Sequence, residues 1–251
     1  MAKQTGIIKL KGTIGDISFY KSGDGHLARA KGGIEASRIA NDPAFQRTRE
    51  NGSEFGRAGK AGKVIRNTIR FLLENAKDKR VVSRLTTDLL KVVKTDTVNA
   101  RGERTVQDGD FAQMVNFDFN KGAKLGSTLF AEHSTTFDRV TGDTTISIEA
   151  FVPNVRIAAP SGATHYKIVM GATELDFANE TSIYELADSG MQVYDNQETG
   201  VIDLTVALSE NSTLPVMAVL GVEFYQEVNG EMYSLRNGAY NSLAVQLAAK
   251  V

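Results

Sequence analysis

Seven cations in one predicted helical stretch are the side chains of this sequence best suited to binding chemistry. Lys63, Arg66 and Arg70 recur at spacings of three and four residues, which places them on one face of a helix. Such a ridge would bind the phosphates of a nucleic acid, with an affinity that falls as salt rises. The full set comprises Arg47, Arg49, Arg57, Lys60, Lys63, Arg66 and Arg70.

The same helix supports a second interpretation. Glu50 lies three residues from Arg47, and Glu54 lies three residues from Arg57, so some of the cations can form ion pairs within the helix. The favoured interpretation is therefore a face that is solvated or contacts another subunit. Nucleic-acid binding is kept as the alternative.

Two glycine-rich segments do not fit known phosphate-binding motifs. A Walker loop needs a glycine five positions before its Gly-Lys pair and a hydroxyl residue after it, but Gly62-Lys63 has Arg57 and Val64 in those places. Gly23-Asp24-Gly25 begins like a dinucleotide fingerprint, but Ala28 stands where the third glycine belongs. A turn is the better interpretation of the second segment.

Metal-binding and catalytic patterns are also missing from the sequence. His26, His133 and His165 are isolated from one another, and residues 195–200 do not follow the ligand pattern of a calcium-binding loop. The chain has no cysteine, which excludes disulfides, thiol nucleophiles and cysteine-ligated metals. We therefore expect no enzymatic activity, no cofactor and no metal.

Composition indicates a folded protein outside the membrane. Hydrophobic residues make up 41% of the 251 positions, enough to bury a core. The first ten residues lack the apolar stretch of a signal peptide, and no window approaches the roughly 18 apolar residues that span a bilayer. We expect a cytoplasmic protein, or part of a particle assembled in the cytoplasm, without membrane contact.

Charge and composition divide the chain near residues 98–104. Residues 1–104 contain 22 basic and 11 acidic side chains, a net charge of +11, whereas residues 105–251 contain 7 basic and 19 acidic side chains, a net charge of −12. Such asymmetry favours a basic surface that meets nucleic acid or the acidic half of another copy, although two solvated surfaces would also account for it. The predicted domains are residues 1–104 and 105–251.

The N-terminal half is predicted to contain short strands followed by a helical hairpin. Glycine-containing turns interrupt the apolar residues between 8 and 20, and a further strand is expected at 26–30. These strands are too short and polar to be stable alone, so we expect them to pack on the helices or on another subunit. Asp42-Pro43 predicts the start of a helix that runs toward residue 76, with a second helix over 79–93.

The C-terminal half alternates apolar and polar residues in segments separated by turn residues, which is typical of half-buried strands. Asn229-Gly230 predicts a tight hairpin. The eight or nine strands predict an antiparallel β-sandwich resembling an immunoglobulin or fibronectin-type domain, without the Cys and Trp of true immunoglobulin domains. The predicted fold class is therefore α+β. The strands are expected near 115–119, 128–131, 146–148, 166–170, 191–194, 202–208, 215–225, 232–235 and 243–247.

The segments GIIKLKGTIGDISFYKSGDGHLARA and NDPAFQRTRENGSEFGRAGKAGKVIR resemble a family of uncharacterised bacterial proteins, many linked to prophages or mobile elements. The resemblance covers mainly residues 5–70. It implies a glycine-rich strand pair and a β-rich C-terminal portion, and it transfers no functional residue. A prophage link would favour a virion-like or other repetitive structural role.

The leading hypothesis is a structural subunit that self-assembles into a filament, tube or virion-like particle. N-terminal strands would complete a sheet in a neighbouring copy. A sandwich that binds carbohydrate or protein is a third hypothesis, with Tyr184, Tyr194 and Tyr240 as its candidate aromatics. The residues predicted at the assembly interface are Ile7, Ile8, Leu10, Ile14, Ile17, Phe19, Tyr20, Gly59 and Gly62, the two glycines because they allow another backbone to approach closely.

Overall fold

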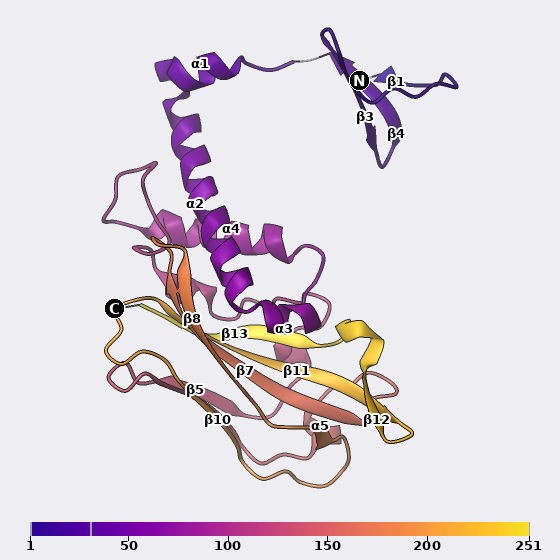
Figure 1. Ribbon diagram of the computed structural model, residues 1–251, viewed down its shortest axis with the longest axis vertical. Helices are drawn as coiled ribbons and strands as arrows, with labels where there is room; N and C mark the ends of the chain where they lie inside the picture. Colours follow the sequence, from indigo (N-terminus) through magenta and orange to yellow (C-terminus); the bar gives the residue numbers. More distant parts are fainter. Residues whose placement is uncertain (1, 31, 251) are drawn as a thin grey trace. The chain divides into compact units, whose positions relative to one another are not determined.

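Residues 2–30 form a small antiparallel sheet in the computed structural model, which describes residues 2–30 and 32–250. Gly15 and Gly25 have φ angles of 54° and 106° at the turns, a conformation that glycine adopts without steric cost. Ile8 and Leu10 lie in the loop that precedes the second strand. In spatial order the strands are β1 (Ala2–Lys3), β4 (Gly25–Ala30), β3 (Ile17–Ser22) and β2 (Gly12–Ile14) (Figure 1).

A capped turn follows this sheet, as the Asp42-Pro43 pair predicts. Helix α1 (Ala36–Asn41) precedes a short 3₁₀ helix (Pro43–Phe45), where the carboxylate of Asp42 accepts a hydrogen bond of 2.9 Å from the amide of Ala44. Residues 1–49 form one compact unit of the chain, and residues 50–251 form the other.

Three helices build one side of the second unit. Helix α2 (Gln46–Thr68) ends near Ile69, whose ψ of 26° interrupts the single helix predicted to reach residue 76. Helix α3 (Arg70–Asn75) follows, and α4 (Val81–Thr95) matches the second predicted helix to within two residues at each end. The apolar faces of these helices are buried in one core cluster.

Two buried carboxylates tie the polar stretch after α4 to the helices. Glu54 is 1% exposed and accepts hydrogen bonds of 2.7 and 2.9 Å from Arg104 and of 2.8 Å from the amide of Gly102. Asp96 accepts bonds from the backbone amides of Val98, Asn99 and Thr105. The boundary predicted near residue 104 therefore falls inside the second unit, since a change of charge does not require a break in packing.

The rest of the second unit is a curled, half-barrel-like arrangement of antiparallel strands, which with the helices gives an α+β fold. The larger sheet contains β12 (Glu231–Ser234), β11 (Val216–Val228), β7 (His165–Asp176) and β8 (Thr181–Asp188), with β13 (Ser242–Ala249) on β11 and β9 (Gln192–Val193) on β7. The smaller sheet contains β10 (Ile202–Ala207), β6 (Asp143–Ile148) and β5 (His133–Phe137). Short helical turns lie at Phe111–Met114, Leu125–Ser127, Pro153–Arg156 (α5) and Leu235–Gly238.

The central strands β7 and β11 of the larger sheet are buried on both faces. On β7, Val169 and Leu175 join the core beneath the helices, whereas Ile168, Met170 and Ala172 join a second core with the smaller sheet (Figure 1). This double burial explains why β7 and β11 are the longest strands and read as nearly continuous apolar runs. The strand predicted at 115–119 is instead a turn at Val115 and Asn116, followed by an isolated bridge between Asp118 and Ala244 of β13.

The lowered pKa of Asp96 makes the stability of this unit dependent on pH. Burial alone would raise its pKa, but the hydrogen bonds from Asn99, Thr105 and Val98 outweigh this and lower it from 3.8 to about 2. A depressed carboxyl pKa stabilises the fold above the unfolded pKa, and this contribution is lost as the pH falls through the folded pKa. We expect Asp96→Asn to lower the free energy of unfolding by about 2 kcal/mol at neutral pH.

Urea unfolding of the wild type and Asp96→Asn between pH 7 and pH 2 checks this. The difference between the two should hold above pH 5 and shrink from about pH 4 toward pH 2. Asp143→Asn, at an exposed strand end, controls for the loss of one charge. A difference that does not change over this range would contradict the assignment.

Candidate functional site

The N-terminal sheet carries its apolar side chains on the outside. No residue among 2–30 and 32–49 is buried, although the sheet is well formed. Phe19 and Tyr20 are half-buried. Of the predicted interface residues, Ile7 is 102% exposed, Ile8 81% and Ile14 62%, with Leu10 and Ile17 also exposed. Large apolar side chains exposed in this number make the sheet a candidate interaction surface.

Gln4 holds the loop that presents Ile7 and Ile8. Its side-chain amide donates hydrogen bonds to the carbonyls of Leu10 (3.3 Å) and Leu27 (3.1 Å), and its oxygen accepts one of 2.8 Å from the amide of Leu10. The backbone of Gln4 is itself bonded to His26 in β4. The isoleucines therefore stand on an ordered loop fastened to the sheet. Sequence reasoning did not find Gln4, because an isolated glutamine gives no local signal of such a bond.

The two glycines predicted at the interface have different surroundings. A Cβ added at Gly62 would lie 3.3 Å from Leu89 and 3.7 Å from Leu85, so this glycine serves the contact between α2 and α4 within the chain. A Cβ added at Gly59 would meet nothing within 4 Å. Gly59 instead forms part of an open pocket of about 520 Å³ beside the exposed side chains of Phe55 and Val82.

Most of the predicted phosphate-binding cations are engaged within the chain or separated from one another. Arg47 and Arg49 belong to the first unit and the other five to the second. Lys63 and Arg47 are exposed, and Arg66 is half-buried, where burial lowers the pKa of its guanidinium. Four cations are engaged within the chain. Arg49 donates hydrogen bonds to the carbonyls of Ile39 and Asp42, and Arg57 donates one to the carbonyl of Gly102. Lys60 forms an ion pair with Glu180, and Arg70 forms one with Glu74.

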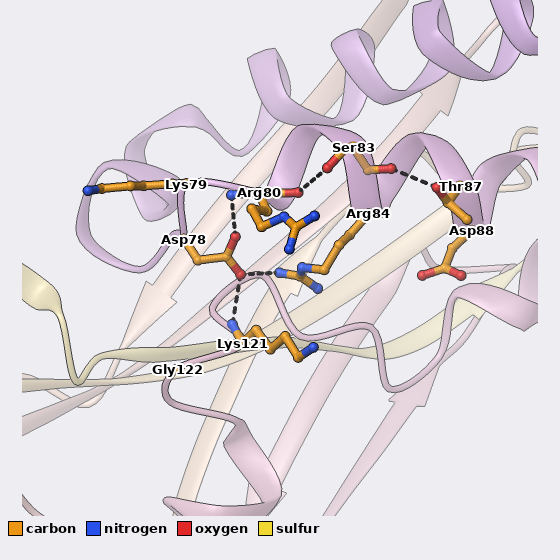
Figure 2. A pocket seen from close by; sticks show the side chains of 9 residues that line it. All are labelled: Asp78, Lys79, Arg80, Ser83, Arg84, Thr87, Asp88, Lys121 and Gly122. Atoms are coloured by element: carbon orange, nitrogen blue, oxygen red, sulfur yellow. Dashed lines mark hydrogen bonds and ion pairs between the residues drawn. The ribbon is translucent and has the colours of Figure 1, made fainter. Parts of the chain in front are cut away.

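A different cationic site lies at the start of α4. It is an open pocket of about 860 Å³ between this helix and the loop at Lys121 (Figure 2). Figure 2 shows Lys79 pointing away from the other side chains that line the pocket. The lining residues are Asp78, Lys79, Arg80, Ser83, Arg84, Thr87, Asp88, Lys121 and Gly122. Sequence reasoning missed this site, because the loop at Lys121 reaches α4 only through the fold.

Asp78 and Arg84 form the wall of this pocket. Asp78 accepts hydrogen bonds from Arg84 (2.5 Å) and from the amides of Arg80 (2.6 Å) and Lys121 (2.9 Å). Burial would raise the pKa of Asp78, but these backbone bonds and Arg84 lower it. Arg84 also donates hydrogen bonds to the carbonyls of Asp118 and Phe119, so its guanidinium holds this loop against α4.

The remaining cations give the pocket an excess of positive charge. Asp88 is paired with Lys91, which leaves Lys79, Arg80 and Lys121 without a carboxylate at ion-pair distance in the described part of the chain. Chemically, this arrangement attracts an anionic group. It contains no nucleophile held by a base.

Metal and catalytic arrangements were sought in the same residues. Within 2–30 and 32–250, no cluster of three or more His, Cys, Asp or Glu side chains fits a metal ion. His133 lies between the carbonyl of Ala131 (3.0 Å) and the side chain of Gln246 (3.1 Å). Tyr225 donates to Glu223, and burial followed by this bond raises the pKa of its phenol. The absence of enzymatic activity stays a prediction.

The aromatics of the third hypothesis serve mainly in packing. Tyr184 packs partly buried against the helical core, and the hydroxyl of Tyr194 donates a hydrogen bond of 3.1 Å to the carbonyl of Ile157. Tyr240 is 38% exposed.

No family model, curated protein or solved structure matches this chain. The resemblance of residues 5–70 to uncharacterised bacterial proteins therefore stays a prediction. In the described part of the chain, none of the helices combines the length and apolar character needed to cross a bilayer.

The different surroundings of Gly59 and Gly62 predict different effects of an alanine substitution on the stability of the folded chain. Gly59→Ala adds a methyl group in open space and should raise the free energy of unfolding by about 1 kcal/mol through helix propensity. Gly62→Ala presses on Leu89 and should give less stabilisation or a loss. Thermal and urea unfolding of both variants measure this, and equal gains would contradict the assigned packing.

Proposed function

We propose that this protein is a non-enzymatic structural subunit that assembles with copies of itself through its N-terminal sheet. The observation that carries the proposal is the exposure of Ile7, Ile8 and Ile14 on a sheet in which none of the described residues is buried. A small isolated sheet is marginal in water, and burying these side chains against a neighbour supplies the missing core.

Charge supports a second copy as the neighbour. Residues 1–49 contain 9 basic and 4 acidic side chains, a net charge of +5, whereas residues 50–251 contain 20 and 26, a net charge of −6. Each chain therefore carries a basic unit and an acidic unit, and contact between unlike units of two copies is electrostatically favourable. Like units of two copies repel.

A contact between unlike surfaces is heterologous. It closes into a ring or continues as a filament or tube, depending on the rotation between copies. The second unit would form the body of each subunit. Its two packed sheets support an immunoglobulin- or fibronectin-like sandwich. In that architecture two sheets pack face to face around a shared core.

The Ile7–Ile8 loop should be essential for assembly. We expect wild-type protein to form large species by light scattering at low and high salt, and Ile7→Ser/Ile8→Ser to be monomeric, because the variant removes the apolar anchors of the contact. Unfolding of the second unit should be unchanged.

Val140→Ser/Val155→Ser is the matched control, since it removes similarly exposed apolar side chains from the second unit. A wild type that stays monomeric at high concentration, or an Ile7→Ser/Ile8→Ser variant that assembles normally, would overturn the proposal.

The second candidate function is nucleic-acid binding. The pocket with Lys79, Arg80 and Lys121 favours it, together with the exposed Lys63 on α2. Phosphate contacts by these cations would release counterions and make the affinity strongly dependent on salt.

Filter binding of DNA and RNA at two salt concentrations tests this candidate. We expect Lys79→Ser/Arg80→Ser/Lys121→Ser to reduce the affinity and the slope of its salt dependence, because three phosphate contacts are lost. Lys94→Ser/Arg156→Ser, at exposed positions outside the pocket, serves as the control. An affinity that is absent in the wild type, or unchanged in the triple variant, removes the candidate.

A further inference from the structure

We propose that the free edge of strand β12 in one copy receives the free edge of strand β2 from the next copy. This inference rests on the proposed self-assembly and specifies the surface that the N-terminal sheet occupies. It joins two strand edges that a single chain leaves unpaired.

The donor edge is β2. This strand ends the N-terminal sheet and, among the described residues, pairs with β3 alone, with Gly12 opposite Phe19 and Ile14 opposite Ile17. All three of its residues are exposed. The main-chain groups on its outer side are therefore available to another strand, which is the basis of strand addition.

The acceptor edge is β12. Within residues 2–30 and 32–250 it pairs with β11 alone, with Ser234 opposite Tyr225 and Glu231 opposite Val228, and all four of its residues are exposed. Asn229 and Gly230 have φ angles of 54° and 85°, as a tight type I′ hairpin turn requires. The hairpin also exposes Val228, Met232 and Tyr233, so its edge offers main-chain groups flanked by apolar side chains.

The charged residues beside these edges favour pairing of β2 with β12 over pairing of either strand with its own copy. Lys9 and Lys11 precede β2, whereas Glu227 and Glu231 lie on the β11–β12 hairpin. Pairing β2 with another β2, or β12 with another β12, would bring like charges together. Pairing β2 with β12 brings opposite charges together, which favours a heterologous contact between two copies.

The edge strand β8 fits this role less well at its two ends. The acidic residues at the two ends of β8 are engaged within the chain, since Glu180 pairs with Lys60 and Asp188 with Lys167. On the hairpin, a carboxylate oxygen of Glu227 lies 3.9 Å from Nε2 of His165, and Glu231 has no ion-pair partner in the described part of the chain. The carboxylates of the hairpin are therefore more available than those at the two ends of β8.

Charge reversal tests the pairing. We expect Lys9→Glu/Lys11→Glu and Glu227→Lys/Glu231→Lys each to weaken assembly on the order of a hundredfold, since each places like charges across the contact. An equimolar mixture of the two variants should assemble, because every contact between unlike variants again joins opposite charges. The variant that carries all four substitutions should assemble alone. Sedimentation velocity at fixed ionic strength measures each case.

Different results would overturn the β2–β12 pairing and the proposed self-assembly. Glu198→Lys/Glu210→Lys, an equal reversal at exposed positions away from the hairpin, is the control and should assemble as the wild type does. If the wild type assembles and Glu227→Lys/Glu231→Lys does so equally well, the inference fails while self-assembly stands. If the wild type never assembles, both fail. Loss of assembly in both variants without recovery in the mixture also overturns the pairing.

Discussion

The main physical constraint on this protein is that a single chain leaves the apolar side chains of its N-terminal sheet exposed to water. Residues 2–30 form an ordered antiparallel sheet, yet Ile7 and Ile8 project from a loop that Gln4 fastens to the sheet. None of its described residues is buried, so the proposed contact with another copy would supply the core that the sheet lacks. The strand edges, the charges and the proposed role of the N-terminal unit are consequences of that constraint.

The second unit satisfies its own requirements within one chain. The central strands of its larger sheet are buried under helices on one face and under the smaller sheet on the other, so the apolar residues of these strands are covered without a partner. Glu54 with Arg104, Asp96 with its amide donors, and Asp78 with Arg84 fasten the connecting loops at three places. This self-sufficiency contrasts with the N-terminal sheet and makes the second unit suitable as the body of a subunit.

Local patterns in the sequence predicted much of this fold. Asp42-Pro43, the three-four spacing of apolar residues in α2 and α4, the period of two in the strands and the turn at Asn229-Gly230 each act over a few residues, so they can be recognised without the fold. The contact between Glu54 and Arg104 spans fifty positions, and the cationic pocket joins α4 to Lys121. Such contacts depend on tertiary packing, which also explains why the change of charge near residue 104 lies inside a packed unit.

The central claim is that the N-terminal sheet is covered by another copy. Amide hydrogen exchange of residues 2–30, measured over a wide range of protein concentration, tests it most directly. The account predicts fast exchange in dilute protein and strong protection of β2 and the Ile7–Ile8 loop at high concentration, together with a rise in mass. Fast exchange of these amides at every concentration, with an unchanged mass, would contradict it.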